Sequence, residues 1–234
     1  MVSYSHESLR MAALSKTAAL QGSSVCTASS CHVINPPQMN AMLRDHDIRP
    51  ALRRLVQELE ADSPDCVVIE ELGLNKGAVR VDVAVVNGIM HAYEIKSDAD
   101  SLRRLTKQVE YYGRCFDRVS LVLGQKHLEL AEKAVPLWWE LLRVAPGGDG
   151  PEFQTVRSGQ QNPARDARAL IELLWREDTL ALLEKKGAAK GVRSKSREVL
   201  WDRAAEMLGL EEIADAVRAH LKANAGRIGL LSAQ

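Results

Sequence analysis

Three charged residues lie in two short apolar segments that a turn separates. Asp82 is in RVDVAVV (80–86), and Glu94 and Lys96 are in IMHAYEIK (89–96). Side chains alternate along a strand, so Glu94 and Lys96 share one face. Because an unpaired buried carboxylate is costly, such groups bind a cation or pair with each other. A Lys96 that merely neutralises Glu94 or Asp82 at a solvated sheet edge is the alternative.

The helix predicted after Asp98 or Asp100 adds Gln108 and Tyr112, four residues apart. An Asp on one strand, Glu-x-Lys on the next and this Gln-x-x-x-Tyr helix resemble the PD-(D/E)XK nuclease superfamily, and the helix resembles its RecB-like exonuclease branch.

A longer stretch carries the resemblance further. From DIRPAL through EELGL, YEIKSDADSLRRLTKQVEYY and FDRVSLVLG to VPLWW, the chain resembles a mostly uncharacterised family of small bacterial proteins assigned to that superfamily. The resemblance is strong over 47–140 and weak in the tail. One departure is Val81, where the superfamily has Pro before the Asp.

The resemblance implies a restriction-endonuclease-like fold and a Mg²⁺-dependent nuclease that hydrolyses phosphodiester bonds in DNA. Asp82 and Glu94 would hold one or two Mg²⁺ or Mn²⁺ ions, which suit hard oxygen ligands. The metal would lower the pKa of a bound water and neutralise charge on the scissile phosphate. Lys96 would orient the nucleophile or stabilise the transition state.

A third carboxylate is commonly needed at such a site. We expect Glu71, at the end of the first strand, with Glu70 and the helical Glu58 as alternatives; Glu71 is otherwise a surface carboxylate. Arg80 shares a face with Asp82, so it contacts phosphate or pairs with Glu71.

Arg104, Gln108 and Tyr112 form a row along one helix face. Gln108 is expected to hydrogen-bond the nucleotide or the attacking water, and Arg104 and Tyr112 to contact nucleic acid. For Tyr112 the alternative is a core aromatic. His127 is a weaker candidate for a catalytic base, and the adjacent pair Trp138-Trp139 is better explained as core plus surface cover than as a stacking platform.

The hairpin between Asp82 and Glu94 tests this interpretation. A two-residue turn at Asn-Gly (87–88) would put the two carboxylates on opposite faces. A three-residue loop over 86–88, with left-handed Gly88, pairs Val85 with Ile89 and Asp82 with Ala92. Function requires the second arrangement, with the carboxylates within roughly 4–6 Å. Packing on the opposite face is then expected of Val81, Val83, Val85, Tyr93 and Ile95.

The elements that position these residues follow from periodicity and turn signals. Asp47 is expected to cap a first helix, and a strand, the hairpin, a helix, a strand, a helix and a second hairpin follow before a helical tail. The predicted fold class is α/β, a mixed, mostly antiparallel sheet flanked by helices, with a small all-helical C-terminal domain. The expected ranges are 47–59, 66–69, 80–86, 89–96, 102–116, 119–123, 128–134, 139–144, 153–156, 164–175, 178–186, 195–208 and 211–223.

The segment 185–203 is basic. Seven Lys or Arg residues oppose Glu198 and Asp202, a net charge of +5. The spacing of Leu180, Leu183, Gly187, Gly191 and Leu200 loosely resembles a SAP-like DNA-binding helix–extended-loop–helix. Contacts with nucleic acid are expected of Lys190, Arg193 and Lys195. A solvated basic loop is the alternative.

Composition narrows the function classes. The 234 residues contain 31 basic and 31 acidic residues, which argues against a polybasic coat but not against a local basic site. The sequence lacks a stretch of ~18 apolar residues and a secretory signal, so a cytoplasmic protein without a membrane partner is expected. Four scattered Cys form no disulfide framework.

Three regions are expected: a poorly ordered arm (1–40), a nuclease-like core (41–160) and a helical C-terminal domain (161–234). Cys26, Cys31 and His32 in the arm match no closed metal site. The expected partner is DNA, and a homodimer is an open possibility. The rival functions are a catalytically silent nucleic-acid-binding module of the same fold and a metal-independent scaffold whose carboxylates form internal ion pairs.

Overall fold

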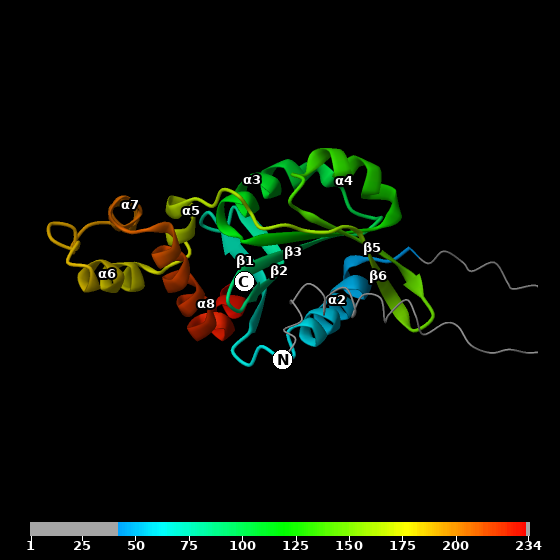
Figure 1. Ribbon diagram of the computed structural model, residues 1–234, viewed down its shortest axis with the longest axis horizontal. Coiled ribbons are helices and arrows are strands. Elements are labelled where there is room, and N and C mark those ends of the chain that lie inside the picture. Colours follow the sequence, from blue (N-terminus) through cyan, green and yellow to red (C-terminus); the bar gives the residue numbers. More distant parts are fainter. Residues whose placement is uncertain (1–41, 233–234) are drawn as a thin grey trace, which may run out of the picture.

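The computed structural model describes residues 42–232, so the predicted arm and its Cys26, Cys31 and His32 lie outside the described residues. The fold is α/β, as expected: a six-stranded mixed sheet is flanked by helices and followed by further helices (Figure 1). The strands are β1 (Val67–Leu74), β2 (Val79–Val86), β3 (Met90–Lys96), β4 (Arg118–Leu123), β5 (Glu140–Gly147) and β6 (Gly150–Arg157). The helices before the tail are α2 (Asp45–Leu59), η1 (Leu102–Arg104), α3 (Leu105–Cys115), η2 (Gln125–His127) and α4 (Leu128–Ala134).

The strands lie in the sheet in chain order, β1 to β6. β1, β2 and β3 are antiparallel neighbours, β3, β4 and β5 run parallel, and β6 returns antiparallel to β5. The parallel pairs need crossover connections, and α3 and α4 supply them on one face while α2 covers the other (Figure 1). The mostly antiparallel sheet and the second hairpin are confirmed.

α2 forms because its apolar residues recur at helical spacing. Ile48, Leu52 and Val56 are completely buried against the sheet. The sequence predicted Asp47 as the N-cap of α2, and this prediction is wrong. The N-cap is Arg44, and the Asp47 carboxylate accepts a hydrogen bond from the Arg44 backbone N–H (2.9 Å), so the helix begins earlier.

The hydrophobic core is divided by the sheet. Val83, Val85, Tyr93 and Ile95 pack as core on one face, as predicted, and the structure shows that they pack there with α2. Val81 does not join them, and lies instead in the cluster with Ala84 on the other face. Strict alternation therefore fails at Asp82.

The same irregularity occurs on β1. Ile69, Leu72 and Leu74 all lie in the cluster that contains Val81, which two-residue alternation does not allow. Glu71, between the paired residues on either side, has φ +55°, a left-handed conformation that is unfavourable for Glu. β1 and β2 thus both kink at the level of Glu71 and Asp82.

The hairpin has a three-residue loop, but not in the predicted register. The loop is 87–89 and Val86 pairs with Met90, so Ala92 opposes Ala84 rather than Asp82. Gly88 does not have the predicted positive φ. The Asn87 side chain closes the loop instead, because its oxygen accepts the Ile89 N–H at 2.8 Å.

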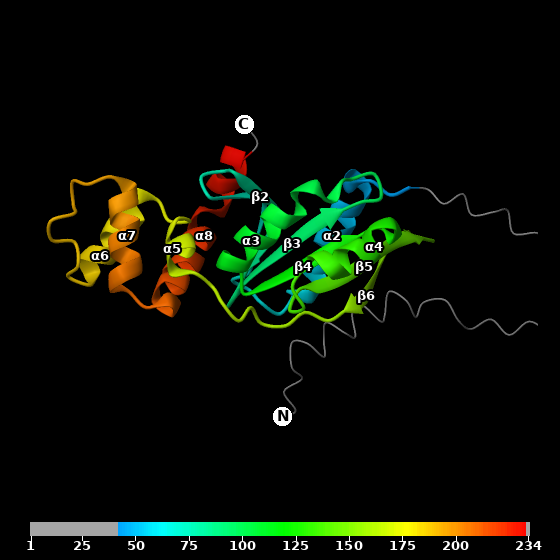
Figure 2. The same ribbon diagram turned by 90° about the horizontal axis from the view of Figure 1, so that it is seen from above.

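The tail is helical, as expected. Its helices are α5 (Ala167–Ile171), α6 (Arg176–Lys185), α7 (Arg197–Met207) and α8 (Leu210–Ser232), which extends beyond the predicted end at 223. α6 and α7 lie beyond the sheet in both views (Figures 1 and 2), and α8 packs against β1 and β2. Buried residues of all four helices belong to the apolar cluster that includes one face of the sheet: Leu170, Leu183, Trp201 and Val217. Within 42–232, no helix is both long and apolar enough to cross a membrane.

Candidate active site

A polar cavity of about 600 Å³ opens where β2 and β3 separate. The last paired residues before it are Val83 and Tyr93, so Asp82 and Glu94 face each other without a backbone pair between them. Seven of the predicted site residues line this cavity: Glu71, Arg80, Asp82, Glu94, Lys96, Arg104 and Gln108.

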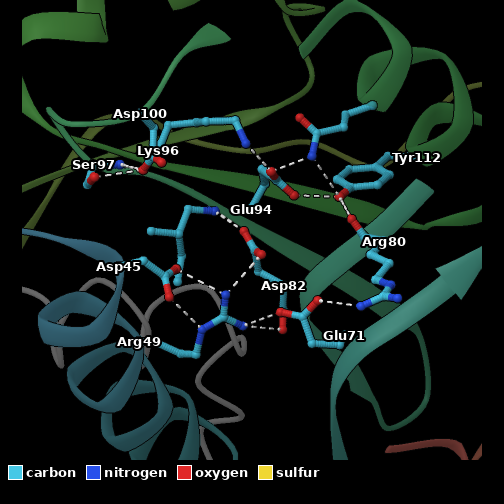
Figure 3. A network of polar contacts seen from close by, with 12 residues as sticks. Asp45, Arg49, Glu71, Arg80, Asp82, Glu94, Lys96, Ser97, Asp100 and Tyr112 are labelled. Carbon is cyan, nitrogen blue, oxygen red and sulfur yellow. Dashed lines mark hydrogen bonds and ion pairs between the residues drawn. The ribbon is translucent and has the colours of Figure 1, made fainter. Parts of the chain in front are cut away.

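Glu94 is the centre of a buried polar network (Figure 3). Its side chain is 2% exposed, and one carboxylate oxygen accepts from both the Lys96 ammonium and the Gln108 amide, while the other contacts the Tyr112 hydroxyl. Burial raises the pKa of Glu94 to about 7, and the charge of Asp82 adds to this, while Lys96 lowers it. One lysine therefore does not fully offset the cost of keeping both carboxylates charged.

Tyr112 has a different role from the predicted contact with phosphate. The ring is completely buried, stacked on Trp139 with centroids 5.9 Å apart. Its hydroxyl lies 2.6 Å from the Arg80 carbonyl oxygen as well as beside Glu94. Burial is the main reason that the pKa of Tyr112 is well above its usual value. Tyr112 is a core aromatic whose polar end positions Glu94.

The Asp82 side chain is held by Arg49 of α2, which lies on the face of the sheet opposite α3. Its Oδ2 accepts the Ile95 backbone N–H at 2.7 Å, in the gap left by the separated strands. Its Oδ1 lies 3.0 Å from Arg49 Nη2 of α2. Arg49 also pairs with Asp45, one turn earlier in α2, and with Glu71 at 3.1 Å.

The structure separates the three candidates for a third carboxylate. Glu71 lines the cavity, and Arg80 pairs with it at 3.9 Å, the alternative that the sequence left open for Arg80. Glu70 pairs with Arg53 of α2 at 3.3 Å, away from the cavity, and Glu58 is exposed on α2.

Arg49, Asp45 and Lys107 line the cavity and were not predicted. Asp45 and Arg49 have the i,i+4 spacing of a helical ion pair, which is the one signal the sequence offers, but it does not indicate contact with β1 and β2. His127 does not line the cavity; its Nε2 lies 3.1 Å from the Asp100 carbonyl oxygen. Trp139 is fully buried and Trp138 partly buried, which agrees with core plus surface cover.

The donor set suits a hard divalent cation. Among residues 42–232 no group of three His, Cys, Asp or Glu side chains is arranged as a ready metal centre. Two carboxylates with water in the remaining positions are nevertheless the usual Mg²⁺ site. The buried Oε1 of Gln108 has no partner in the described chain, so the network around Glu94 is incomplete as it stands.

The basic residues that the sequence predicted in the segment 185–203 for DNA binding, Lys190, Arg193 and Lys195, lie away from this cavity. They are in the loop between α6 and α7. Gly187 (φ +70°) and Gly191 (φ +81°) adopt left-handed conformations in this loop, and the buried side chains of Ala189 and Val192 anchor it. Lys190, Arg193 and Lys195 are exposed. Arg193 pairs with Glu184, whereas Lys190 and Lys195 form no ion pair with any residue in 42–232.

The helical tail contacts one wall of the cavity. Lys76, in the turn between β1 and β2, pairs with Glu198 of α7 at 3.0 Å. The next residue, Gly77, lines the cavity.

Comparison with known proteins identifies a family. Residues 41–227 match the family described as Bacteriophage P4 protein cII. The chain belongs to this family. Protein cII of Enterobacteria phage P4 is 28% identical to it over 122 residues, which are 52% of this chain and 46% of that protein, so the chain spans about half the length of this relative. Among solved structures, a protein of unknown function from Silicibacter pomeroyi, SPO1766, is 20% identical, with a TM-score of 0.34 over 59% of this chain and 87% of that one.

Proposed function

We propose that this member of the protein cII family is a Mg²⁺-dependent nuclease that hydrolyses phosphodiester bonds in DNA, with a core of the restriction-endonuclease-like, PD-(D/E)XK type. The observation that carries the proposal is the meeting of Asp82, Glu94 and Lys96 in one polar cavity where β2 and β3 part. Buried charges of this kind are expensive to keep, and they gather where chemistry needs them.

The chain's own residues have distinct parts in the proposed reaction. Asp82 and Glu94 would hold the ion, with Glu71 as a third carboxylate, and Mg²⁺ or Mn²⁺ when bound lowers the pKa of water and neutralises charge on phosphate. Lys96, beside Glu94, orients the attacking water with its ammonium. Gln108 fixes Glu94 through its amide and directs its unpartnered Oε1 toward the same water.

The exposed basic side chains extend the proposal to substrate binding. Arg104, at the end of η1, and Lys107, in α3, line the cavity and are available to the phosphates next to the cleaved bond. Lys190, Arg193 and Lys195 would hold a more distant part of the same DNA through phosphate contacts, which need no base sequence. The contact of α7 with the β1–β2 turn connects the two surfaces.

The test is cleavage of end-labelled single-stranded, duplex and flap DNA with Mn²⁺. We expect the wild-type chain to cleave at least one substrate, and Glu94→Gln and Lys96→Met to abolish cleavage. Glu70→Gln is the matched control, because it removes a neighbouring carboxylate that lies outside the cavity. Equal cleavage by wild type and Glu94→Gln would overturn the assignment of the activity to this cavity.

Binding without cleavage would favour the silent module of the same fold. Calorimetric titration with Mn²⁺ separates the rivals further, because a scaffold whose carboxylates only form internal ion pairs binds no metal. If the chain bound no Mn²⁺, the proposed function would be overturned.

A further inference from the structure

Arg49 ties together the carboxylates of the cavity from the side of α2 (Figure 3). Its Nη2 lies 3.0 Å from Asp82 Oδ1, and its Nη1 lies 3.1 Å from Glu71 Oε1. The same Nη1 donates to the Asp82 backbone carbonyl at 3.0 Å. The side chain is only 20% exposed, so the guanidinium is enclosed by these groups.

These contacts conflict with a metal ion on Asp82. A Mg²⁺ ion lies about 2.1 Å from a carboxylate oxygen, so an ion on Asp82 Oδ1 would be within about 5 Å of Arg49 Nη2. Positive charges that close repel each other strongly in a partly enclosed site. The other oxygen, Oδ2, already accepts the Ile95 N–H at 2.7 Å, so it offers less room for an ion.

We propose that Arg49 is a resident counter-cation, which a divalent metal ion must displace from Asp82 and Glu71. This inference rests on the proposed function, which assigns those carboxylates to the metal. Arg49 stabilises the metal-free site by placing one positive charge between two strand carboxylates that Lys96 does not contact. Its presence therefore sets how tightly the metal binds.

Asp45 gives the displaced side chain a place to remain. Arg49 Nε and Nη2 contact its two oxygens, each at 3.0 Å, and the residues are one helical turn apart on α2. This pair does not depend on β1 or β2, so it persists when the contacts to Asp82 and Glu71 are broken. A guanidinium kept at the edge of the cavity is suited to contact two oxygens of an incoming phosphate.

Calorimetric titration of the full chain with Mn²⁺ tests the inference without an activity readout. We expect Arg49→Met to bind Mn²⁺ roughly tenfold more tightly than wild type, because the competing cation is gone. Arg80→Met is the matched control, since it removes the same charge from the same cavity but contacts Glu71 only at 3.9 Å. It should change the affinity by less than about threefold.

Arg49→Lys covers the case in which Arg49→Met does not fold. It keeps the charge but lacks the forked donors, so it should fold and bind Mn²⁺ with intermediate affinity. In the wild type, the NMR signals of the Arg49 Nη–H groups, which contact Asp82 and Glu71, should shift on titration with diamagnetic Mg²⁺. These signals are assigned by their loss in either variant. An unmoved signal at saturating Mg²⁺ would overturn the displacement.

The outcomes separate this inference from the proposed function. Binding by wild type with no gain in the Arg49 variants, or an equal gain in Arg80→Met, refutes the counter-cation and leaves the metal site intact. If only the Arg49 variants bind Mn²⁺ and the wild type does not, the result supports the counter-cation, because Arg49 then excludes the metal completely. No binding by any variant overturns both.

Discussion

Asp82 and Glu94 face each other where β2 and β3 separate, yet each is neutralised from a different face of the sheet. Arg49 of α2 contacts Asp82, and Lys96 with the α3 side chains Gln108 and Tyr112 surrounds Glu94. Two like charges can share one cavity because each lies beside a cation, although Asp82 shares Arg49 with Asp45 and Glu71. The balance is incomplete for Glu94, whose pKa is raised to about 7 mainly by burial.

The Glu94–Lys96 pair should behave as one unit in a double-mutant cycle. Lys96→Met removes the cation from a carboxylate that is almost fully buried, so we expect a loss of about 3 kcal/mol in the free energy of unfolding at pH 8. The loss is limited because Glu94 can take up a proton. Adding Glu94→Gln to Lys96→Met should recover more than half of it. Urea unfolding of the four proteins measures the coupling, and additive effects would show that the pair is not coupled.

Sequence patterns succeeded where the rules are local and failed where distant segments meet. The i,i+2 rule placed Glu94 with Lys96, and apolar alternation placed Val83 and Val85 in the core on the opposite face, where they pack with α2. The same rule placed Val81 on the wrong face, because β2 kinks at Asp82 and neither Gly nor Pro marks the kink. The contact of Arg49 with β2 spans 33 residues, and no local spacing encodes it.

The register of the hairpin shows a related limit. An odd loop was required for Asp82 and Glu94 to share a cavity, and the loop has three residues. The Asn-Gly dipeptide suggested that Gly88 supplies the turn through positive φ, but the Asn87 side chain closes it. A side chain that replaces a backbone turn is difficult to distinguish by residue type alone, because Asn and Gly both favour turns.

The left-handed backbone at Glu71 is expected to cost stability in exchange for the position of its carboxylate. At φ +55° a residue with a Cβ is strained by roughly 1 kcal/mol, and glycine is not. Glu71→Gly should therefore be about 1 kcal/mol more stable than Glu71→Ala, although glycine in a strand normally destabilises. Urea unfolding compares the two. Lower stability of the glycine variant would mean that the kink carries no strain.

The basic loop between α6 and α7 is predicted to bind DNA through phosphates. Lys190→Gln with Lys195→Gln should weaken binding and reduce the slope of log affinity against log salt by about 0.9 for each duplex phosphate that is no longer neutralised. The side chains are exposed, so the fold should be unaffected. Fluorescence anisotropy with labelled duplex DNA at several salt concentrations gives the slope.

The control for this experiment is Arg54→Gln with Lys133→Gln, which removes two exposed charges from α2 and α4. An unchanged slope in the loop variant, or an equal change in the control, would contradict a specific role of the loop. Deleting residues 161–234 is not a clean alternative. It would expose the face of the sheet against which α8 packs.

His220 on α8 should make the stability of the helical tail depend on pH. It is buried against the edge of the Trp175 ring, with Asp178 3.0 Å away, and Arg227 lies over that same ring. Burial lowers the pKa of His220 below 6.5 and outweighs the opposing effect of Asp178. The unfolded chain thus binds the proton more readily than the folded one. The part of the free energy of unfolding that comes from neutral, buried His220 is fully present above about pH 6.5. It is lost as the pH falls toward the lowered pKa, by at most about 1.4 kcal/mol per pH unit.

Urea unfolding at pH 7.5 and pH 5 checks this with two variants. His220→Gln should lose less stability than wild type between the two pH values, because the titrating group is gone. Asp178→Asn should lose more, because without the carboxylate the pKa of His220 falls further from its value in the unfolded chain. If His220→Gln and wild type lost the same amount, the acid sensitivity would have to come from other groups, and His220 would be only a packing residue.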